Sequence, residues 1–215
     1  MRVIGEHVTF THPGGERPVL SDLMMDLPAG SSTAIVGPSG SGKTTLLSLL
    51  GELLRPQTGR FSCVDRHGRV FRPRDVATWV LQTVSLLPDR TVSDNVRLGA
   101  YLDGADRTTA DLRAASALAR MSLADRGHES ARVLSGGEAQ RVAIARALAS
   151  ARPVMLADEP TGQLDGVTTD RVLDALLGSA GRTVVLVTHD GRAAARCDRV
   201  LRLDRGRLHP LGDAG

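Results

Sequence analysis

One short run restricts what this chain can fold into more than any other feature of its sequence. The run is Gly37-Pro38-Ser39-Gly40-Ser41-Gly42-Lys43-Thr44-Thr45, and it fits the pattern G-x-x-x-x-G-K-[ST]. Its glycines allow a tight turn in which backbone N–H groups point inward and can bind anionic oxygens. Residues 31–36 are typical of a β-strand, and a helix is expected to begin near Gly42. The run therefore predicts a phosphate-binding loop between a strand and a helix.

The lysine of this run distinguishes the loop from an ordinary turn rich in glycine and serine. Lys43 is the only lysine among the 27 lysine and arginine residues of the chain. The planar fork of arginine replaces a compact ammonium poorly in a small nest of N–H groups. The alternative is a turn with a solvated lysine, but the flanking strand and helix argue against it. We expect Lys43 to contact the β- and γ-phosphates of a nucleotide and the Thr44 hydroxyl to bind Mg²⁺.

The composition is that of an ordinary domain with an aliphatic core. The 215 residues are 41% hydrophobic and 24% charged, but only 2% aromatic, so base stacking on an aromatic platform is improbable. The net charge of +3 is only weak evidence for nucleic acid or an anionic membrane as a partner. Cys63 and Cys197 lack metal-binding spacing, and neither a membrane-spanning run nor a signal-peptide pattern is found. We therefore expect a cytoplasmic protein whose membrane role requires a partner.

The order of the elements predicted from the sequence indicates an α/β fold. Strands are expected at 2–10, 19–27, 61–64, 76–81, 154–157 and 183–187, helices at 94–98, 109–121, 137–150 and 168–177, and a hairpin at 199–208. We expect a P-loop NTPase core with a mostly parallel sheet and an N-terminal antiparallel β subdomain, formed by residues 1–82 and 151–215. An α-helical subdomain at about 83–150 is inserted into this core. In the helix at 109–121, capped by Thr108 or Thr109, we expect a buried stripe that contains Leu112, Ala115, Leu118 and Ala119.

Two carboxylates follow the apolar strand that ends near residue 157. At the carboxyl end of a parallel strand, Asp158 can face the Mg²⁺ of the phosphate site. Glu159 can then act as a base or position the water that attacks the γ-phosphate. The alternative is a strand-end turn with two solvated acids, which would be favoured without the phosphate loop. With that loop in the same chain, we interpret the pair as catalytic.

The segment Leu134-Ser135-Gly136-Gly137-Glu138 precedes the helix expected at 137–150. A serine hydroxyl and paired glycines at a helix start can form a second anion site. The same pattern is also a capping box, in which Ser135 caps the helix and Glu138 bonds back to it. One domain needs only one γ-phosphate site, whereas in a dimer each Ser135 loop (residues 134–138) could close over the nucleotide of the other copy.

Together these stretches resemble the ATP-binding subunits of ABC transporters. The matching residues are the phosphate loop, residues 134–148 and residues 157–161, in the order and spacing of the family. The run 158–165 is similar to the lipoprotein-release, macrolide-exporter and cell-division group, although Gln163 stands where that group usually has asparagine. The resemblance implies that ATP and Mg²⁺ are bound and that the chain pairs with a second ATP-binding subunit, expected to be identical.

The resemblance also assigns roles that the residues alone do not. It implies that Gln82 contacts Mg²⁺ and the attacking water, that Asp165 acts across a dimer interface, and that His189 touches the γ-phosphate. Without the family, Gln82 would be an ordinary loop glutamine, Asp165 the N-cap of the next helix, and His189 a structural histidine. In the place of the aromatic residue that usually stacks on adenine, this sequence has His12. An imidazole covers less area, which puts adenine selectivity in doubt, and Phe10 is the other candidate.

The sequence therefore predicts an ATP-hydrolysing subunit that works as a head-to-tail dimer on the cytosolic face of a membrane permease. The alternative is an ABC ATPase that acts on DNA or ribosomes without a membrane partner. Such relatives usually carry tandem ATPase domains, a long coiled coil or zinc-binding cysteines, and these features are absent from the sequence. We therefore expect no nucleic-acid partner.

Overall fold

The computed structural model describes residues 1–162, 164–179 and 181–211. The chain divides into two compact units. The sheet unit consists of Met1–Ala77, Pro153–Asp158 and Ala180–Gly215, and the helical unit consists of Thr78–Arg152 and Glu159–Ser179. The chain thus leaves the sheet unit after Ala77, returns for one strand, and leaves it again between the adjacent carboxylates Asp158 and Glu159.

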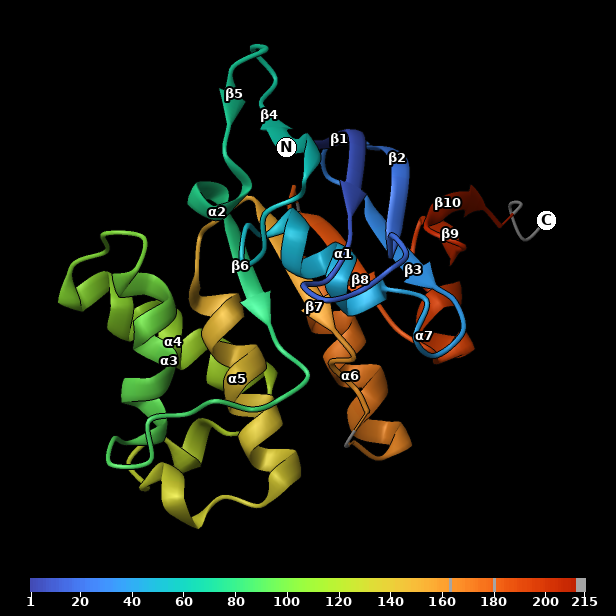
Figure 1. Ribbon diagram of the computed structural model, residues 1–215. Helices are drawn as coiled ribbons and strands as arrows, with labels where there is room; N and C mark the ends of the chain where they lie inside the picture. Colours follow the sequence, from blue (N-terminus) through green and yellow to red (C-terminus); the bar gives the residue numbers. More distant parts are fainter. Residues whose placement is uncertain (163, 180, 212–215) are drawn as a thin grey trace. The chain divides into compact units, whose positions relative to one another are not determined.

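An antiparallel sheet opens the sheet unit. Its strands are β1 (Arg2–Phe10), β2 (Leu20–Leu27), β4 (Thr58–Val64) and β5 (Val70–Phe71), in the order β2-β1-β4-β5 (Figure 1). In β2, buried residues alternate with exposed ones along most of the strand, as expected when one face of a sheet packs against a core. The predicted N-terminal antiparallel β subdomain is confirmed. Strand β4 begins three residues before the predicted strand at 61–64, because Thr58 and Arg60 also pair with β1.

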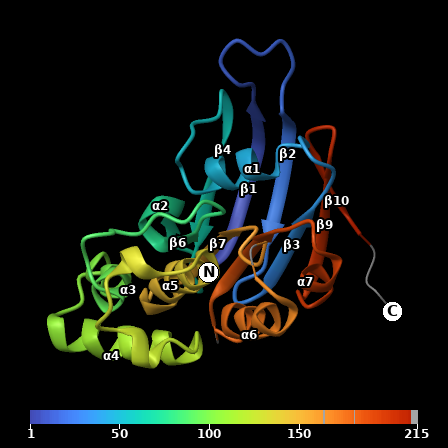
Figure 2. The ribbon, with the colours of Figure 1, turned by 90° about the horizontal axis from the view of Figure 1, so that it is seen from below.

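A second sheet of the same unit carries the parallel strands. They are β3 (Ser32–Val36), β7 (Val154–Asp158), β8 (Thr183–Val187) and β9 (Arg199–Asp204), with β10 (Arg207–Pro210) antiparallel to β9. The order within the unit is β10-β9-β3-β8-β7, and Figure 2 shows the β9–β10 hairpin beside β3. Every residue of β7 and β8 is buried, which explains their continuous apolar sequences. The mostly parallel sheet and the terminal hairpin are confirmed.

In the described part of the sheet unit, the helices are α1 (Lys43–Leu50), α2 (Pro73–Val76) and α7 (Gly191–Ala195). Helix α1 contacts β7 and β8 and buries four leucines, which are Leu46, Leu47, Leu49 and Leu50. This packing fixes the direction of α1 relative to the sheet, and hence the place of its first turn. The sequence predicted one strand over 76–81, but Pro73 starts α2 and delays the strand β6 to Ala77–Val80.

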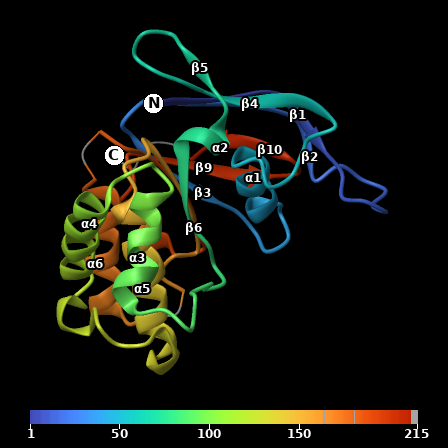
Figure 3. The same ribbon diagram turned by 90° about the vertical axis from the view of Figure 1, so that its left-hand side faces the viewer.

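The helical unit contains α3 (Val92–Tyr101), α4 (Arg107–Arg120), α5 (Gly136–Ala149) and α6 (Gly166–Leu177), with short 3₁₀ turns η1 (Ala124–Arg126) and η2 (Ala131–Val133). Helices α3, α4 and α5 pack against one another (Figure 3). The contact between α3 and α5 depends on Gly99, because a Cβ atom there would lie 1.9 Å from the carbonyl oxygen of Arg146. Aliphatic residues and alanines fill this core.

Two details of the prediction for α4 were wrong. Its cap is Asp106, whose carboxylate accepts a bond of 2.8 Å from the Thr109 N–H, so the helix begins two residues before the predicted start. The buried face is formed by Ala110, Ala114, Ala117 and Leu118, spaced i, i+4, i+7 and i+8. The predicted members Leu112, Ala115 and Ala119 are therefore exposed, and Leu112 is 69% accessible.

Candidate nucleotide-binding site

The phosphate loop joins β3 to α1, as predicted. Gly40 and Gly42 have φ values of 76° and 97°, in the left-handed region that favours glycine. Space also requires glycine here, since a Cβ at Gly37 would lie 2.5 Å from the carbonyl oxygen of Leu203. A Cβ at Gly42 would lie 2.4 Å from Cγ1 of Val19. The sequence of this loop is thus imposed both by backbone conformation and by the close approach of neighbouring strands.

The loop presents donors where a phosphate would be held. The cap of α1 is Gly42, which has no side chain that could accept from the N–H groups of the first turn, where the helix dipole is positive. Lys43 reaches back across the loop, and its Nζ donates to the carbonyl oxygens of Gly37 at 2.9 Å and Pro38 at 3.0 Å. The Oγ of Ser41 is buried and has no hydrogen-bond partner among the described residues. These groups fit an anion such as the phosphates of a nucleotide.

Register in the parallel sheet brings the other predicted residues of this unit to the same edge. Ile35 of β3 and Asp158 of β7 are both in register with Val187 of β8. The phosphate loop follows β3, Asp158 ends β7, and Thr188 follows β8 with its N–H bonded to the carbonyl oxygen of Ile35 at 3.3 Å. Asp158 is only 4% exposed. The sheet therefore places Asp158 and His189, the residue after Thr188, at the carboxyl edge that also carries the loop.

A cavity of about 530 Å³ adjoins this edge within the sheet unit. Val36, the last residue before the phosphate loop, and His189 line it together with residues of α7 and β9. Cys197 also lines it, and burial raises the pKa of this thiol to about 11. A thiol with that pKa is protonated at neutral pH and is a poor nucleophile.

His12 lies beside the phosphate loop. Its Nε2 is 3.2 Å from the Oγ1 of Thr45, the last residue of the loop, although 33 positions separate the two in sequence. The neighbouring Phe10 is 5% exposed and meets the His12 ring edge to face, with centroids 5.0 Å apart. Phe10 is therefore a core residue, and the exposed His12 is the ring available next to the loop.

In the helical unit, the Ser135 loop forms the start of α5. The Ser135 hydroxyl accepts a bond of 3.3 Å from the Glu138 N–H, and the Glu138 carboxylate accepts one of 2.8 Å from the Ser135 N–H. This is the capping box that the sequence allowed as an alternative. Gly136 and Gly137 form the first turn of the helix, and their N–H groups face its N-terminal end.

The remaining predicted residues occupy loops of the helical unit. Gln82 is exposed and comes two residues after β6. Glu159 has a φ of 44°, an uncommon left-handed conformation for a residue with a side chain and one often found at functional sites. Asp165 caps α6 by accepting from the Thr168 N–H at 2.9 Å, and this bond holds the pKa of Asp165 below its ordinary value. Gln163 lies outside the described residues.

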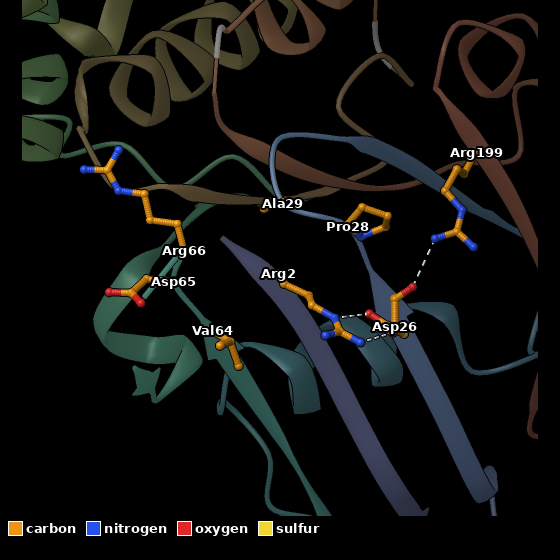
Figure 4. Close-up of a pocket in the computed structure, with 8 residues that line it drawn as sticks. All are labelled: Arg2, Asp26, Pro28, Ala29, Val64, Asp65, Arg66 and Arg199. Carbon is orange, nitrogen blue, oxygen red and sulfur yellow. Dashed lines mark hydrogen bonds and ion pairs between the residues drawn. The ribbon is translucent and has the colours of Figure 1, made fainter. Parts of the chain in front are cut away.

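A second cavity of the sheet unit, of about 550 Å³, lies at the other end of the strands (Figure 4). Pro28 and Ala29 line it just before β3, whereas the phosphate loop follows β3. The three arginines that line it are already engaged. Arg2 donates to the Asp26 carboxylate at 2.7 Å, and Arg199 donates to the Asp26 carbonyl at 3.0 Å. Arg66 donates to Nε2 of His67 at 3.1 Å. We therefore assign the nucleotide to the loop edge and not to this cavity.

Sequence reasoning missed two polar residues that organise the helical unit. Asn95 is fully buried and bonds to the backbone of Leu87 and Thr91, which shapes the segment that follows Gln82. Arg126 donates to Glu138, at the start of α5. Neither residue belongs to a motif, and the partners become evident only when the chain is folded.

The site combines a strand, a glycine-rich loop and a helix start that can hold phosphate, with an acidic residue at the end of another parallel strand of the same sheet. This combination defines the P-loop nucleoside-triphosphatase class. Comparison with known proteins gives the family. The family described as ABC transporter matches residues 20–162. The lipoprotein-releasing system ATP-binding protein LolD of Chromohalobacter salexigens is 42% identical over 88% of this chain and 84% of its own length.

Two further comparisons support the same family. The macrolide export ATP-binding/permease protein MacB 2 of Aeromonas hydrophila is 40% identical over 90% of this chain, which spans 31% of the MacB 2 sequence. The dimeric structure of a post-hydrolysis state of the ATP-binding cassette MJ0796, bound to ADP and Pi, superposes with a TM-score of 0.84, 33% identity and 96% coverage of both chains. The chain belongs to the ABC transporter family and is an ATPase cassette of that family. The resemblance to the lipoprotein-release and macrolide-export group is confirmed.

None of the helices in the described part of the chain is both long and apolar enough to span a membrane.

Proposed function

We propose that this chain is the ATP-hydrolysing subunit of an ABC transporter and powers a separate membrane permease through ATP-driven closure of a dimer. The observation that carries the proposal is the register of Ile35, Val187 and Asp158, because it gathers the phosphate loop, Asp158 and the segment before His189 at one sheet edge. The relatives support the same activity, since they include a lipoprotein-releasing ATP-binding protein and a macrolide export protein. The transported substrate is left open.

In the proposed reaction, the phosphate loop and Lys43 hold the triphosphate and stabilise the charge that develops on the transferring phosphoryl group. The Thr44 hydroxyl, Asp158 and Gln82 would hold Mg²⁺, which neutralises phosphate charge when it is bound. Glu159 accepts a proton from the attacking water or orients it, and His189 donates to the γ-phosphate. His12 contacts the base.

The second half of each site comes, in this proposal, from a second identical copy. Ser135, Gly136 and Gly137 of one copy bind the γ-phosphate held by the other, and Asp165 acts across the interface. ATP closes the dimer and hydrolysis reopens it, so the helical unit transmits the change to the permease. The chain would then lie at the cytoplasmic face of the cell membrane, and the division into a core at 1–82 and 151–215 with a helical insertion remains a prediction.

The test uses Glu159→Gln, which keeps the shape of the side chain but removes its basicity. With Mg-ATP, size-exclusion chromatography with light scattering should give twice the mass of the chain, and removal of ATP should restore the monomer. Lys43→Ala in the same background is the control, and it should remain monomeric because it cannot hold the triphosphate. A Glu159→Gln chain that stays monomeric at saturating ATP would contradict the dimer mechanism.

A second experiment identifies the partner that the ATPase drives. Glu159→Gln is expressed in the native host, and the proteins that co-purify from membranes solubilised with Mg-ATP are identified. A permease at a fixed ratio supports the transporter proposal. If ribosomal proteins or DNA co-purify without a membrane protein, the ATPase assignment stands but the proposed permease partner is rejected.

A further inference from the structure

We infer that Arg126 is a positioning residue for Ser135. It holds and neutralises the Glu138 carboxylate, and thereby sets how readily the Ser135 loop accepts the γ-phosphate on the other copy of the chain. This inference rests on the proposed function, because it assumes that the Ser135 loop binds a phosphate. It assigns a role to an arginine outside the motifs of the sequence.

The Glu138 carboxylate is the centre of the arrangement. Its Oε2 accepts two bonds of 2.8 Å from Ser135, one from the backbone N–H and one from the hydroxyl. Its Oε1 accepts a bond of 2.5 Å from Nη1 of Arg126. The bonds from Ser135, with a further contribution from Arg126, keep the pKa of Glu138 below its ordinary value, so the carboxylate is charged at neutral pH.

Arg126 is itself held on two sides. It is the last residue of η1, twelve positions before Glu138, and it also forms an ion pair with Glu129. The carbonyl oxygen of Glu129 accepts from the Val92 N–H at 2.9 Å, which ties this segment to the start of α3. The guanidinium is about one-third exposed and Glu138 is 20% exposed, so their interaction is only partly screened by solvent.

Two consequences follow for a phosphate that approaches Ser135. The hydroxyl has one proton, which it now donates to Glu138, and it must turn away from that carboxylate to donate to a γ-phosphate. The phosphate also brings negative charge to within a few bonds of an ionised carboxylate, and like charges at such a distance repel. Arg126 opposes both effects, because it offers Glu138 another donor and offsets part of its charge, although it is shared with Glu129.

The experiment compares Arg126→Met, Glu138→Gln and the double variant. Methionine retains most of the length and packing of arginine without its charge, and glutamine can still accept the Ser135 N–H bond through its amide oxygen. Two quantities are measured: the ATP concentration for half-maximal dimerisation in the Glu159→Gln background, and KM and kcat for ATP with Glu159 intact. Arg60→Ala is the matched control, since Arg60 forms an exposed ion pair with Glu6.

We expect Arg126→Met to raise the half-maximal ATP concentration and KM about tenfold, with a smaller change in kcat. This loss of ATP affinity should diminish at higher salt, because salt screens the charge of the Glu138 carboxylate. Glu138→Gln in the same chain should restore both values to within about twofold, because the side chain bonded to Ser135 then carries no charge. The inference would be overturned if Glu138→Gln did not reduce the loss of ATP affinity in Arg126→Met. It would also be overturned if the loss accompanied a lower melting temperature in every variant.

A second substitution keeps the test decisive if Arg126→Met folds poorly. Arg126→Lys keeps the charge but not the two-pronged donor, and we expect it to stay within about threefold of the parent. A tenfold loss of ATP affinity in Arg126→Lys would mean that geometry matters and charge does not, against the inference.

Ser135→Ala separates this result from the proposed function. If Ser135→Ala dimerises and hydrolyses ATP normally, the proposed contact of Ser135 with the γ-phosphate of the other copy has failed, whereas a loss there with a normal Arg126→Met rejects the inference alone.

Discussion

The ammonium of Lys43 lies 2.9 Å from the carbonyl oxygen of Gly37, at the opposite end of the phosphate loop. A second bond, of 3.0 Å, joins it to the carbonyl oxygen of Pro38. The lysine thus spans the concave side of the loop and points its charge at the place where phosphate oxygens would be bound. An arginine would spread the same charge over a planar group too large for these two carbonyls.

Substitution of Lys43 is expected to abolish tight binding of ATP while the fold is retained. Lys43→Ala and Lys43→Arg should each weaken ATP binding by about 2–3 kcal/mol, or about 100-fold, because a charge-assisted hydrogen bond to phosphate is lost or misplaced. Isothermal titration calorimetry measures the affinity, and the melting temperature without nucleotide controls for folding. An Arg variant that binds ATP like the parent would contradict the need for a compact charge.

The uniqueness of Lys43 allows a chemical test as well. Because the sequence holds no other ε-amino group, an amine-reactive reagent can label only Lys43 and the N-terminus. ATP should protect Lys43, and mass spectrometry of the peptide that contains it gives the labelled fraction. Equal labelling with and without ATP would show that the ammonium does not contact the nucleotide.

His12 is expected to give weak discrimination between ATP and GTP. Its ring lies against Thr45 and covers less area than a tyrosine would, so we expect the two affinities to differ by less than about tenfold. His12→Tyr should strengthen ATP binding by about 1 kcal/mol, and His12→Ala should weaken it by a similar amount, since stacking on a base contributes about 1–3 kcal/mol. Competition against a fluorescent nucleotide measures all three. No change in His12→Ala would place the base elsewhere.

Much of the sheet unit could be predicted from sequence because its signals are local. A pattern only a few residues long was enough to predict the phosphate loop, the apolar strands β7 and β8, and the β9–β10 hairpin. The start of α4 was misplaced because Thr108 and Thr109 were taken as its cap, whereas the folded backbone shows that Asp106 accepts the capping bond. Leu112 was assigned to the core because its spacing from Ala115 and Leu118 fits one face of a helix, whereas the packed face is the one that holds Ala110, Ala114 and Ala117.

The residues that act through other residues could not be found in this way. Arg126 and Glu138 are separated by twelve positions and a 3₁₀ turn, and Asn95 bonds to a loop with no regular structure. In the sequence, Arg126 and Asn95 are each one polar residue among many. Their partners are set by the packing of α3 and α5, which depends on contacts between segments far apart in the chain.

The close contact of α3 with α5 predicts that Gly99→Ala destabilises the protein. The added Cβ would lie 1.9 Å from the carbonyl oxygen of Arg146, so the helices must separate, at a cost of about 1–3 kcal/mol or more. Urea unfolding measures the free energy of unfolding. Gly166→Ala is the control, because its Cβ meets nothing within 4 Å. It should change stability by less than about 0.5 kcal/mol. Equal stability of the two variants would contradict the packing described for Gly99.

A last prediction concerns acid stability and the carboxylate of Asp198. It accepts bonds from the Ser32 N–H at 2.7 Å and from the Ser32 hydroxyl at 2.8 Å, which joins the starts of β3 and β9. These bonds hold the pKa of Asp198 below its ordinary value. A group with a depressed pKa in the folded state stabilises the fold fully above the pKa of the unfolded chain, about 3.9, and loses this contribution as pH falls through the folded value.

Asp198→Asn should therefore be less stable than the parent at pH 7, and by the same amount at pH 5. This difference in the free energy of unfolding should shrink between about pH 4 and pH 2. Urea unfolding across this range measures the difference in free energy at each pH. Asp89→Asn, on a carboxylate that is 78% exposed, serves as the control and should change stability at pH 7 by less than about 0.5 kcal/mol. A difference for Asp198→Asn that persists unchanged to pH 2 would mean that shape, and not charge, makes Asp198 hold the two strands together.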